Sequence, residues 1–406
     1  MEPSPHGTSS GERPEAQPSA DSLPGKRVHV LHLTPFYPVA GDDASGCFVS
    51  EPLPGLERAG VKNTVMAVRP VYRGRARVCE SAPPAVWVHY VAPPGGIGLV
   101  AAGAFLFARI LSEIRRLHEA DPVDLIHAHA PLPCGHTAAL LHRELGIPYV
   151  VSVHGLDAFS TRQVKGSAGR WCKRVSQMVY RSARRVICIS ERVRDEVEDG
   201  AAAPIRAEVV YNGVDPERFS PGEAEPGPMV LSIGNLIPTK GHDLLLHAVA
   251  ALNVEHPALH CKIIGTGPEY RRLLKLAEQL GIADRVQFPG RQSRQNVARA
   301  LRHCTVFALP SHYEGLGCVY LEAMATGKPV IACRGQGIAE VIQNGHNGWL
   351  ADASDVRGLA QVLSILLKDP GLRERMGSAA RRTILQGYTL AHQAEQLVRI
   401  YRECLE

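Results

Sequence analysis

The sequence lacks several features that would place it in other classes of protein. Aromatic residues make up only 5% of its 406 residues, and its ten cysteines include no pair with C-x-x-C spacing. Neither a zinc site built from cysteine pairs nor a thioredoxin-like redox motif is therefore expected. Several cysteines lie inside apolar, strand-like runs, such as Cys188 in VICIS, where cysteine acts as a small hydrophobic residue. Single, scattered cysteines favour a reducing, cytoplasmic location.

Charge of one sign and long apolar runs are also scarce. Lys and Arg number 45 and Asp and Glu number 40, and this formal net charge of +5 is too small to argue for a nucleic-acid partner. The longest apolar run, Ile97 to Ala108, contains two glycines and is too short to span a bilayer. Residues 1–25 are rich in Pro, Ser, Gly and Glu, which predicts a disordered tail and neither a signal peptide nor an anchor.

The rest of the chain shows two series of short, Val- and Ile-rich strands that alternate with helical stretches. This alternation predicts an α/β fold with two parallel sheets, each covered on both faces by helices. A chain of this length is also too long for one ordinary core, so two domains are expected. The predicted strands are VHVLHLT, TVMAV, VWVHYV, LIHAH, YVVSV, RVICIS and AEVVY in the first series, and MVLSIG, LHCKIIG, RVQFPG, TVFALP, KPVIA and GWLA in the second.

The domain boundaries follow from composition. A segment dense in proline, glycine and charge separates the two series and is the predicted linker. Two prolines inside FVSEPLPGLERAG predict that the helix after the first strand starts late or kinks. Because parallel sheets bind ligands beyond the carboxyl ends of their strands, we expect the site in the cleft between the domains. The predicted units are an N-terminal Rossmann-like domain (26–215), a linker (216–228), a C-terminal Rossmann-like domain (229–388) and an amphipathic helix that packs back on the N-terminal domain (389–406).

The stretch 308–332, ALPSHYEGLGCVYLEAMATGKPVIA, predicts a strand, a glycine-rich corner, a helix that begins near Cys318, and a second strand. Gly315 and Gly317 remove side chains where a backbone must come close to another group, and the helix N-terminus suits a phosphate. Glu314 and Glu322 bracket the corner with seven residues between them, and carboxylates accept strong hydrogen bonds from vicinal hydroxyls. An anionic, sugar-like ligand is the hypothesis. A surface position for Glu322 and a capping role for Glu314, or a glycosidase pair, are the alternatives.

Three further motifs fit the same kind of ligand. Lys240 in GNLIPTKG lies at a helix start, where a compact positive charge meets a diphosphate or is simply solvated. Gly265 and Gly267 follow a strand in GTGP, which is weak as a dinucleotide signature and equally consistent with a tight turn. His154 in VHGLD directly follows a strand, so it projects into the expected cleft. His127 and His129 alternate with apolar residues and are interpreted as sheet positions.

Together with VVYNGVDPERF, these motifs resemble, in this order, the retaining nucleotide-sugar glycosyltransferases of family 4. The resemblance covers nearly the whole chain from Val28 onward. It implies the GT-B architecture of two facing Rossmann-like domains, with the acceptor on the N-terminal side and the donor on the C-terminal side. It implies transfer of a sugar from a nucleotide diphosphate to an acceptor hydroxyl with retention, by a front-face route without a protein nucleophile. Polysaccharide or lipid-linked glycan synthesis is the implied pathway.

The resemblance also implies roles for individual residues. His154 and Glu314 would face the transferred sugar as the catalytic pair, Glu322 would hold ribose hydroxyls, and Lys240 would meet the diphosphate. Asn235 stands where the family often has an arginine, which leaves one fewer cation for the pyrophosphate. The remaining donor-binding residues that the resemblance implies are Gly46 (equally consistent with a plain flexible loop), Gly234, Gly265, Gly267, Arg291, Gly315, Leu316, Gly317 and Cys318.

No D-x-D motif occurs, which fits a reaction that needs no metal, and no cofactor is expected beyond the nucleotide-sugar co-substrate. Two other functions stay open. A sugar-nucleotide epimerase or a phosphorylase on the same architecture would need further catalytic groups or a lysine-bound cofactor. A catalytically silent nucleotide-sugar binding protein is favoured only by Asn235.

Residues 162–185 form a basic segment. Between Ala158 and Ser190 there are eight Lys and Arg residues and no acid, and Trp171, Val175, Met178 and Val179 would share a helix face. This pattern predicts either a solvated helix packed on its own sheet or a face that contacts an anionic membrane carrying a lipid-linked acceptor. The second reading adds a peripheral location on the inner face of the membrane. The acceptor itself is expected to be a glycan or a lipid-linked glycan.

Overall fold

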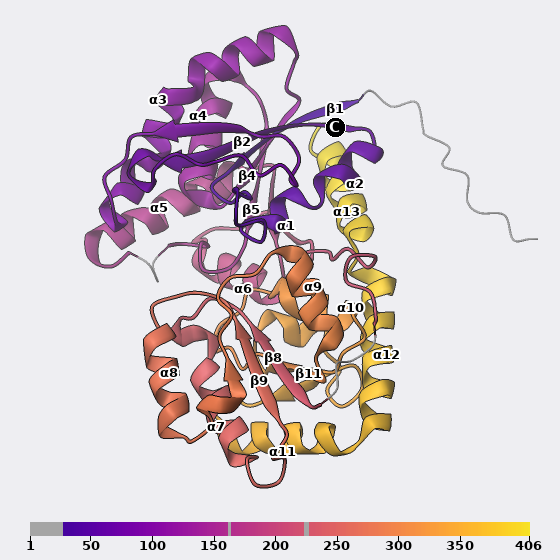
Figure 1. Ribbon diagram of the computed structural model, residues 1–406. Coiled ribbons are helices and arrows are strands. Elements are labelled where there is room, and N and C mark those ends of the chain that lie inside the picture. The colour runs from indigo at the N-terminus through magenta and orange to yellow at the C-terminus, as the bar shows by residue number, and fades with distance from the viewer. Residues whose placement is uncertain (1–26, 161–163, 223–226) are drawn as a thin grey trace, which may run out of the picture.

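The structure is a computed structural model that describes residues 27–160, 164–222 and 227–406. The predicted disordered tail, together with small parts of the basic segment and of the linker, lies outside these ranges. Two sheets of parallel strands form two domains stacked one above the other (Figure 1). Their strand orders are β3-β2-β1-β4-β5-β6-β7 and β10-β9-β8-β11-β12-β13, with helices around each sheet. The predicted α/β class with two Rossmann-like domains is confirmed.

The first sheet contains all seven strands predicted for it. Its helix after the first strand is interrupted as predicted, because α1 ends at Ser50 and α2 starts at Leu53, with Pro52 between them unable to donate a helical hydrogen bond. The strands are β1 (Val28–Thr34), β2 (Val61–Pro70), β3 (Val86–Tyr90), β4 (Leu125–His129), β5 (Tyr149–Val153), β6 (Arg185–Cys188) and β7 (Ala207–Val209). The α-helices are α1 (Cys47–Ser50), α2 (Leu53–Arg58), α3 (Gly96–Ala120), α4 (His136–Leu145), α5 (Gly166–Ser182) and α6 (Glu191–Gly200).

The second sheet contains the six strands predicted for it, several of them shorter than the apolar runs. They are β8 (Met229–Ile233), β9 (His260–Ile264), β10 (Val286–Gln287), β11 (Val306–Ala308), β12 (Val330–Cys333) and β13 (Trp349–Ala351). The helices in this part of the chain are α7 (His242–Ala251), α8 (Tyr270–Gln279), α9 (Arg294–His303), α10 (Cys318–Ala325), α11 (Val356–Lys368) and α12 (Pro370–Gly387), with the 3₁₀ turns η3 (Pro238–Lys240) and η5 (Gly337–Glu340). The last helix is α13 (Leu390–Glu403).

The last two helices carry the chain back to the first domain. In Figure 1, α12 rises along the second domain and α13 lies beside α2 against the first sheet. Buried apolar side chains of α13, among them Leu397 and Ile400, share a core cluster with Val30 of β1 and Leu56 of α2. The hydroxyl of Tyr401 also lies 2.7 Å from Nδ1 of His127 on β4. The C-terminal helix is thus part of the N-terminal domain.

Two chain segments cross between the domains, and they are hydrogen-bonded to each other. The backbone N–H of Val214 donates to the carbonyl of Tyr388, and the N–H of Leu390 donates to the carbonyl of Val214, both at 3.0 Å. A Cβ at Gly213 would lie 2.4 Å from the carbonyl oxygen of Thr389, so only glycine allows the two segments to lie this close. The two crossings form one narrow connection.

The apolar residues of α5 do not all lie exposed on one side of the helix, as a lipid-facing surface would require. Val175 and Val179 are buried against the first domain's core, whereas the side chain of Trp171 is 50% exposed. The four residues therefore do not form one exposed apolar face, because Val175 and Val179 pack inside the protein. Among the residues that the structure describes, no helix combines the length and the apolar character needed to cross a bilayer.

Candidate functional site

The glycine-rich corner between β11 and α10 lies directly against the other domain. A Cβ at Gly315 would lie 2.8 Å from the backbone carbonyl of His154, so the absence of a side chain permits this contact. Gly317 has a positive φ of 85° and is the N-cap of α10, which begins at Cys318 as predicted. The hydroxyl of Ser190 also donates across the cleft to the carbonyl of Gly315, at 2.6 Å. The corner thus brings the free N–H groups of a helix start to the cleft.

Glu314 and Lys240 form an ion pair beside this corner. Lys240 Nζ lies 2.5 Å from Glu314 Oε1, and the same oxygen accepts a hydrogen bond from the Ser311 hydroxyl at 3.0 Å. The side chains are only 8% (Glu314) and 20% (Lys240) exposed. The backbone N–H of Glu314 donates to the side-chain oxygen of Gln336, at 2.9 Å. These contacts hold one cation and one carboxylate in a defined orientation at the cleft.

Close backbone packing explains the glycines that surround Lys240. Gly241 has a φ of 65°, and a Cβ there would lie 2.1 Å from the carbonyl oxygen of Pro310. In the same way, Gly265 packs on the carbonyl of Gly234, and Gly267 packs on that of Leu236. The two loops therefore lie backbone against backbone at the carboxyl ends of β8 and β9, with the side chain of Asn235 exposed at their edge. This geometry accounts for the glycines without a ligand.

Glu322 has a partner that the sequence did not indicate. Arg294, at the start of α9, places Nη1 2.5 Å from Glu322 Oε1, and its Nε and Nη2 each lie 3.0 Å from an oxygen of Glu51 in the N-terminal domain. The guanidinium also stacks on the ring of Phe219, with its carbon 4.8 Å from the ring centroid. This Arg294 bridge, formed by Glu51, Arg294 and Glu322, joins the two domains; Arg294 and Glu322 are buried and the side chain of Glu51 is 13% exposed.

Two further contacts close the same side of the cleft. The backbone N–H of Arg294 donates to Asp43 at 3.0 Å, and Arg291 forms an ion pair with Asp42. Arg291 Nη2 also lies 3.4 Å from Thr266 Oγ1 at the GTGP corner. Gly46 follows in this loop with a φ of 70°, and a Cβ there would lie 2.4 Å from the backbone of Phe36 and Tyr37. Gly46 is therefore explained by packing within its own domain.

His154 lies at the opposite wall of the cleft from Glu314. Its backbone N–H donates to Asp157 Oδ1 at 2.9 Å. The ring packs beside Phe48, at a centroid distance of 4.7 Å, and Phe36, at 5.8 Å, and these two rings also contact each other. Burial lowers the pKa of His154 to about 3, so the imidazole is neutral at physiological pH. Burial also raises the pKa of Asp157 to about 7.

The structure thus gathers most of the predicted site residues at one cleft. The glycine corner, Lys240, Glu314 and the backbone of His154 lie close together, and Leu316 is fully buried beneath the corner. Cys318 Sγ lies 3.3 Å from Asn212 Nδ2, and burial raises the pKa of its thiol to about 12, so it remains a thiol. The residues that the sequence analysis missed are Glu51, Arg294, Ser311 and Gln336. Nothing in their local sequence distinguishes them from surface polar residues.

Comparison with known proteins agrees with this architecture. Residues 214–383 match the family described as "Glycosyl transferases group 1", and residues 49–218 match "Glycosyltransferase Family 4". The D-inositol 3-phosphate glycosyltransferase of Frankia alni is 32% identical over 313 residues, covering 71% of this chain and 76% of the relative. Sucrose-phosphate synthase from Thermosynechococcus elongatus has a TM-score of 0.78 at 21% identity, covering 93% of this chain and 99% of its own. Anabaena HepE, solved in complex with UDP-glucose, has a TM-score of 0.72 at 20% identity, covering 92% and 99%.

The Arg294 bridge makes a prediction about the contact between the two domains. In Arg294→Ala the buried carboxylate of Glu322 loses its cation, whereas Glu51 keeps its ion pair with Arg218, so we expect the free energy of unfolding to fall by roughly 3–5 kcal/mol through Glu322. We also expect the domains to separate, which small-angle X-ray scattering would record as a larger radius of gyration. Arg299→Ala, on the same helix but exposed, is the matched control. An unchanged radius in Arg294→Ala would show that the bridge does not hold the domains together.

Proposed function

This chain belongs to the group 1 glycosyltransferases, and we propose that it moves a sugar from a nucleoside diphosphate to an acceptor hydroxyl with retention of anomeric configuration. The observation that carries the proposal is the ion pair between Lys240 and Glu314, held at the glycine corner against the backbone of His154. A nucleotide sugar needs a cation for its diphosphate and acceptors for its hydroxyls, and this pair offers both at one point.

The chemical burden in this proposal falls on positioning and electrostatics. Lys240 and the N–H groups at the start of α10 stabilise the charge that develops on the leaving diphosphate. Glu314 accepts hydrogen bonds from sugar hydroxyls, and Glu322 has a second carboxylate oxygen for the ribose while the first contacts Arg294. A donor phosphate oxygen takes the proton of the incoming acceptor hydroxyl, so no residue of the chain forms a covalent intermediate. We propose no metal, because Lys240 supplies the positive charge.

The donor and the acceptor are proposed by class. HepE binds UDP-glucose and the Frankia alni relative bears the name of an inositol-phosphate glycosyltransferase, which supports a nucleotide-sugar donor and a hydroxyl acceptor. We propose that the acceptor is a glycan or a lipid-linked glycan in polysaccharide or related glycan synthesis in the cytoplasm. Asn235 leaves Lys240 as the main cation of this loop, so donor affinity should depend strongly on this one residue.

Acceptor-free hydrolysis separates the transferase from its two rivals. We expect the protein to release free sugar slowly from one member of a panel of UDP-, GDP- and ADP-sugars in the presence of EDTA, with the anomer retained by NMR. Glu314→Gln should slow this release at least tenfold, whereas the exposed control Glu374→Gln should not. Binding without release would indicate a silent binding protein. A changed sugar that stays attached to its nucleotide would indicate an epimerase.

Lys240→Ala should weaken nucleoside diphosphate binding about 10- to 100-fold, because a hydrogen bond to a charged group contributes roughly 1.5–3 kcal/mol. Titration calorimetry with UDP, GDP and ADP would measure this change without any knowledge of the sugar. The control is Lys275→Ala, which removes an exposed lysine of α8 in the same domain. Equal diphosphate affinity in Lys240→Ala and the wild type would remove Lys240 from the phosphate site.

We also propose peripheral contact with an anionic membrane through the solvent-facing side of α5. Trp171 is exposed there, and Arg170 and Arg174 lie one helical turn apart beside it. We expect co-sedimentation with vesicles that contain phosphatidylserine but not with phosphatidylcholine alone. Replacing Arg170 and Arg174 with alanine should reduce it, and replacing Arg271 and Lys275 of α8 should not. Equal partitioning onto both kinds of vesicle would refute the contact.

A further inference from the structure

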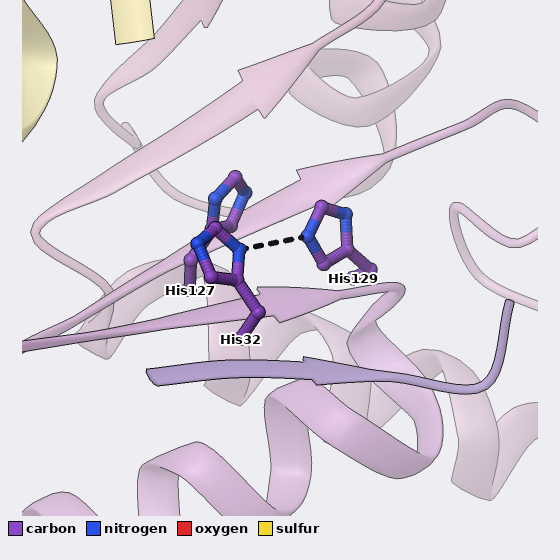
Figure 2. A group of neighbouring side chains, drawn as sticks. All are labelled: His32, His127 and His129. Atoms are coloured by element: carbon purple, nitrogen blue, oxygen red, sulfur yellow. Dashed lines mark hydrogen bonds between the residues drawn. The ribbon is translucent and has the colours of Figure 1, made fainter. Parts of the chain in front are cut away.

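A row of four histidines, three of them buried, crosses the first sheet and ends at the candidate site. His32 lies on β1, His127 and His129 lie on β4, and His154 directly follows β5. The first three are 2%, 1% and 6% exposed. Figure 2 shows them together, with a hydrogen bond between His32 and His129. The proposed function uses only His154 of the four, so the other three need an explanation of their own.

A metal site is one explanation, since the ligand atoms of His32, His127 and His129 lie within 4.8 Å of one another. A metal ion lies in the plane of each imidazole that binds it, so its ligands must point at one centre. The rings of His127 and His129 are instead stacked face to face, with centroids 4.2 Å apart. Both nitrogens of His127 already have partners at 2.7 Å, the hydroxyls of Tyr401 and Ser152. This arrangement suits a hydrogen-bonded structure better than a metal cage.

The other ring contacts describe a chain of imidazoles joined edge to edge. His32 Nδ1 lies 3.5 Å from His129 Nε2, and His129 Nδ1 lies 3.4 Å from His154 Nε2. The interplanar angles in these two contacts are only 22° and 14°. The centroid separations, 5.8 and 5.5 Å, exceed the nitrogen separations by about one ring width, so the facing nitrogens lie on the line between the rings. These are long but well-aligned hydrogen bonds.

The far end of the chain fixes the direction of every bond in it. Asn63 donates its amide N–H to the carbonyl of Leu53 at 3.3 Å, which turns its side-chain oxygen toward His32 Nε2 at 3.0 Å. A carbonyl oxygen only accepts, so His32 carries its proton on Nε2 and presents a lone pair at Nδ1. Burial lowers the pKa values of His32 and His129, so each ring is neutral with one N–H. His129 must then donate through Nε2, and His154 must do the same.

The chain therefore leaves one nitrogen unused at the site. Nδ1 of His154 is buried and, among the residues that the structure describes, has no hydrogen-bond partner. An unpaired polar atom in this position costs stability until a ligand satisfies it. The neighbouring rings of Phe36 and Phe48 offer no proton to it, and the sugar of a bound donor carries hydroxyls that do.

We propose that the chain from Asn63 to His129 holds His154 as its Nε2–H tautomer, so that Nδ1 accepts a hydrogen bond from a hydroxyl of the bound sugar. Asn63, His32 and His129 are positioning residues, because they act only through His154. The proposal rests on the proposed function for the identity of the ligand, but the tautomer itself is a property of the free protein. A His154 with its proton on Nδ1 would present a donor instead, and it would lose this contact.

The test is ¹⁵N NMR of the full-length protein labelled at histidine, since protonated and unprotonated ring nitrogens have well-separated shifts. The His154 signals are assigned from their loss in His154→Gln. Asn63→Leu removes the acceptor that begins the chain, whereas Asn63→Asp keeps one, and both lose the bond to Leu53. We expect His154 to be protonated at Nε2 alone in the wild type and in Asn63→Asp, and to become mixed in Asn63→Leu.

The outcomes separate this inference from the proposed function, because the NMR measurement needs no donor. A proton on Nδ1 of His154 in the wild type, or an unchanged tautomer in Asn63→Leu, would overturn the chain. One equivalent of zinc that shifts the signals of His32 and His127 would overturn it in favour of a metal site. If Asn63→Leu does not fold, the wild-type spectrum alone decides. Where donor hydrolysis is measurable, kcat/KM should fall about five- to tenfold in Asn63→Leu and stay within twofold in Asn63→Asp.

Discussion

The bond between Arg294 and two carboxylates from opposite domains is the interaction on which the arrangement of the cleft depends. Arg294 satisfies Glu51 and Glu322 at the same time, and no member could be buried alone without a large loss of solvation free energy. The group is therefore stable only when the domains are close together. Glu322, the residue with the proposed ribose contact, is held by Arg294 of its own domain, and Arg294 is held in turn by Glu51 of the N-terminal domain. Contact between the domains and the orientation of Glu322 are thus physically linked through Arg294.

The two sides of the site are organised by different kinds of contact. On the donor side, glycines bring loops together backbone against backbone, so Lys240 and Glu314 meet at positions set by the main chain. On the other side, His154 is held by rings and hydrogen bonds that reach across three strands. Contacts between backbones persist when surrounding side chains change. A series of hydrogen-bonded side chains is interrupted when any one of them is replaced. This difference explains why sequence motifs identified Lys240 and Glu314 but did not identify the contacts that hold His154.

Local pattern accounts for most of what could be predicted. Short apolar runs between turn residues located the strands of both sheets, and the prolines near Ser50 marked the helix break. Glu314, Lys240 and the glycine corner were found because each lies in a distinctive local motif. The Arg294 bridge could not be found, because Arg294 and Glu51 are 243 positions apart and each resembles a surface residue. The histidines were correctly placed in strands, but their alignment depends on the pairing of His32 with His127 between β1 and β4, which local sequence does not encode.

The paired crossing at Val214 and Thr389 restricts how the two domains can move. The two backbone segments are hydrogen-bonded to each other, and no side chain separates them at Gly213. This close contact restricts twisting and sliding of one segment along the other. Any opening between the domains must keep this connection or break its two hydrogen bonds, and it must also break the Arg294 bridge. Because the connection and the bridge both form within the chain itself, the free-energy cost of placing one domain against the other is met during folding.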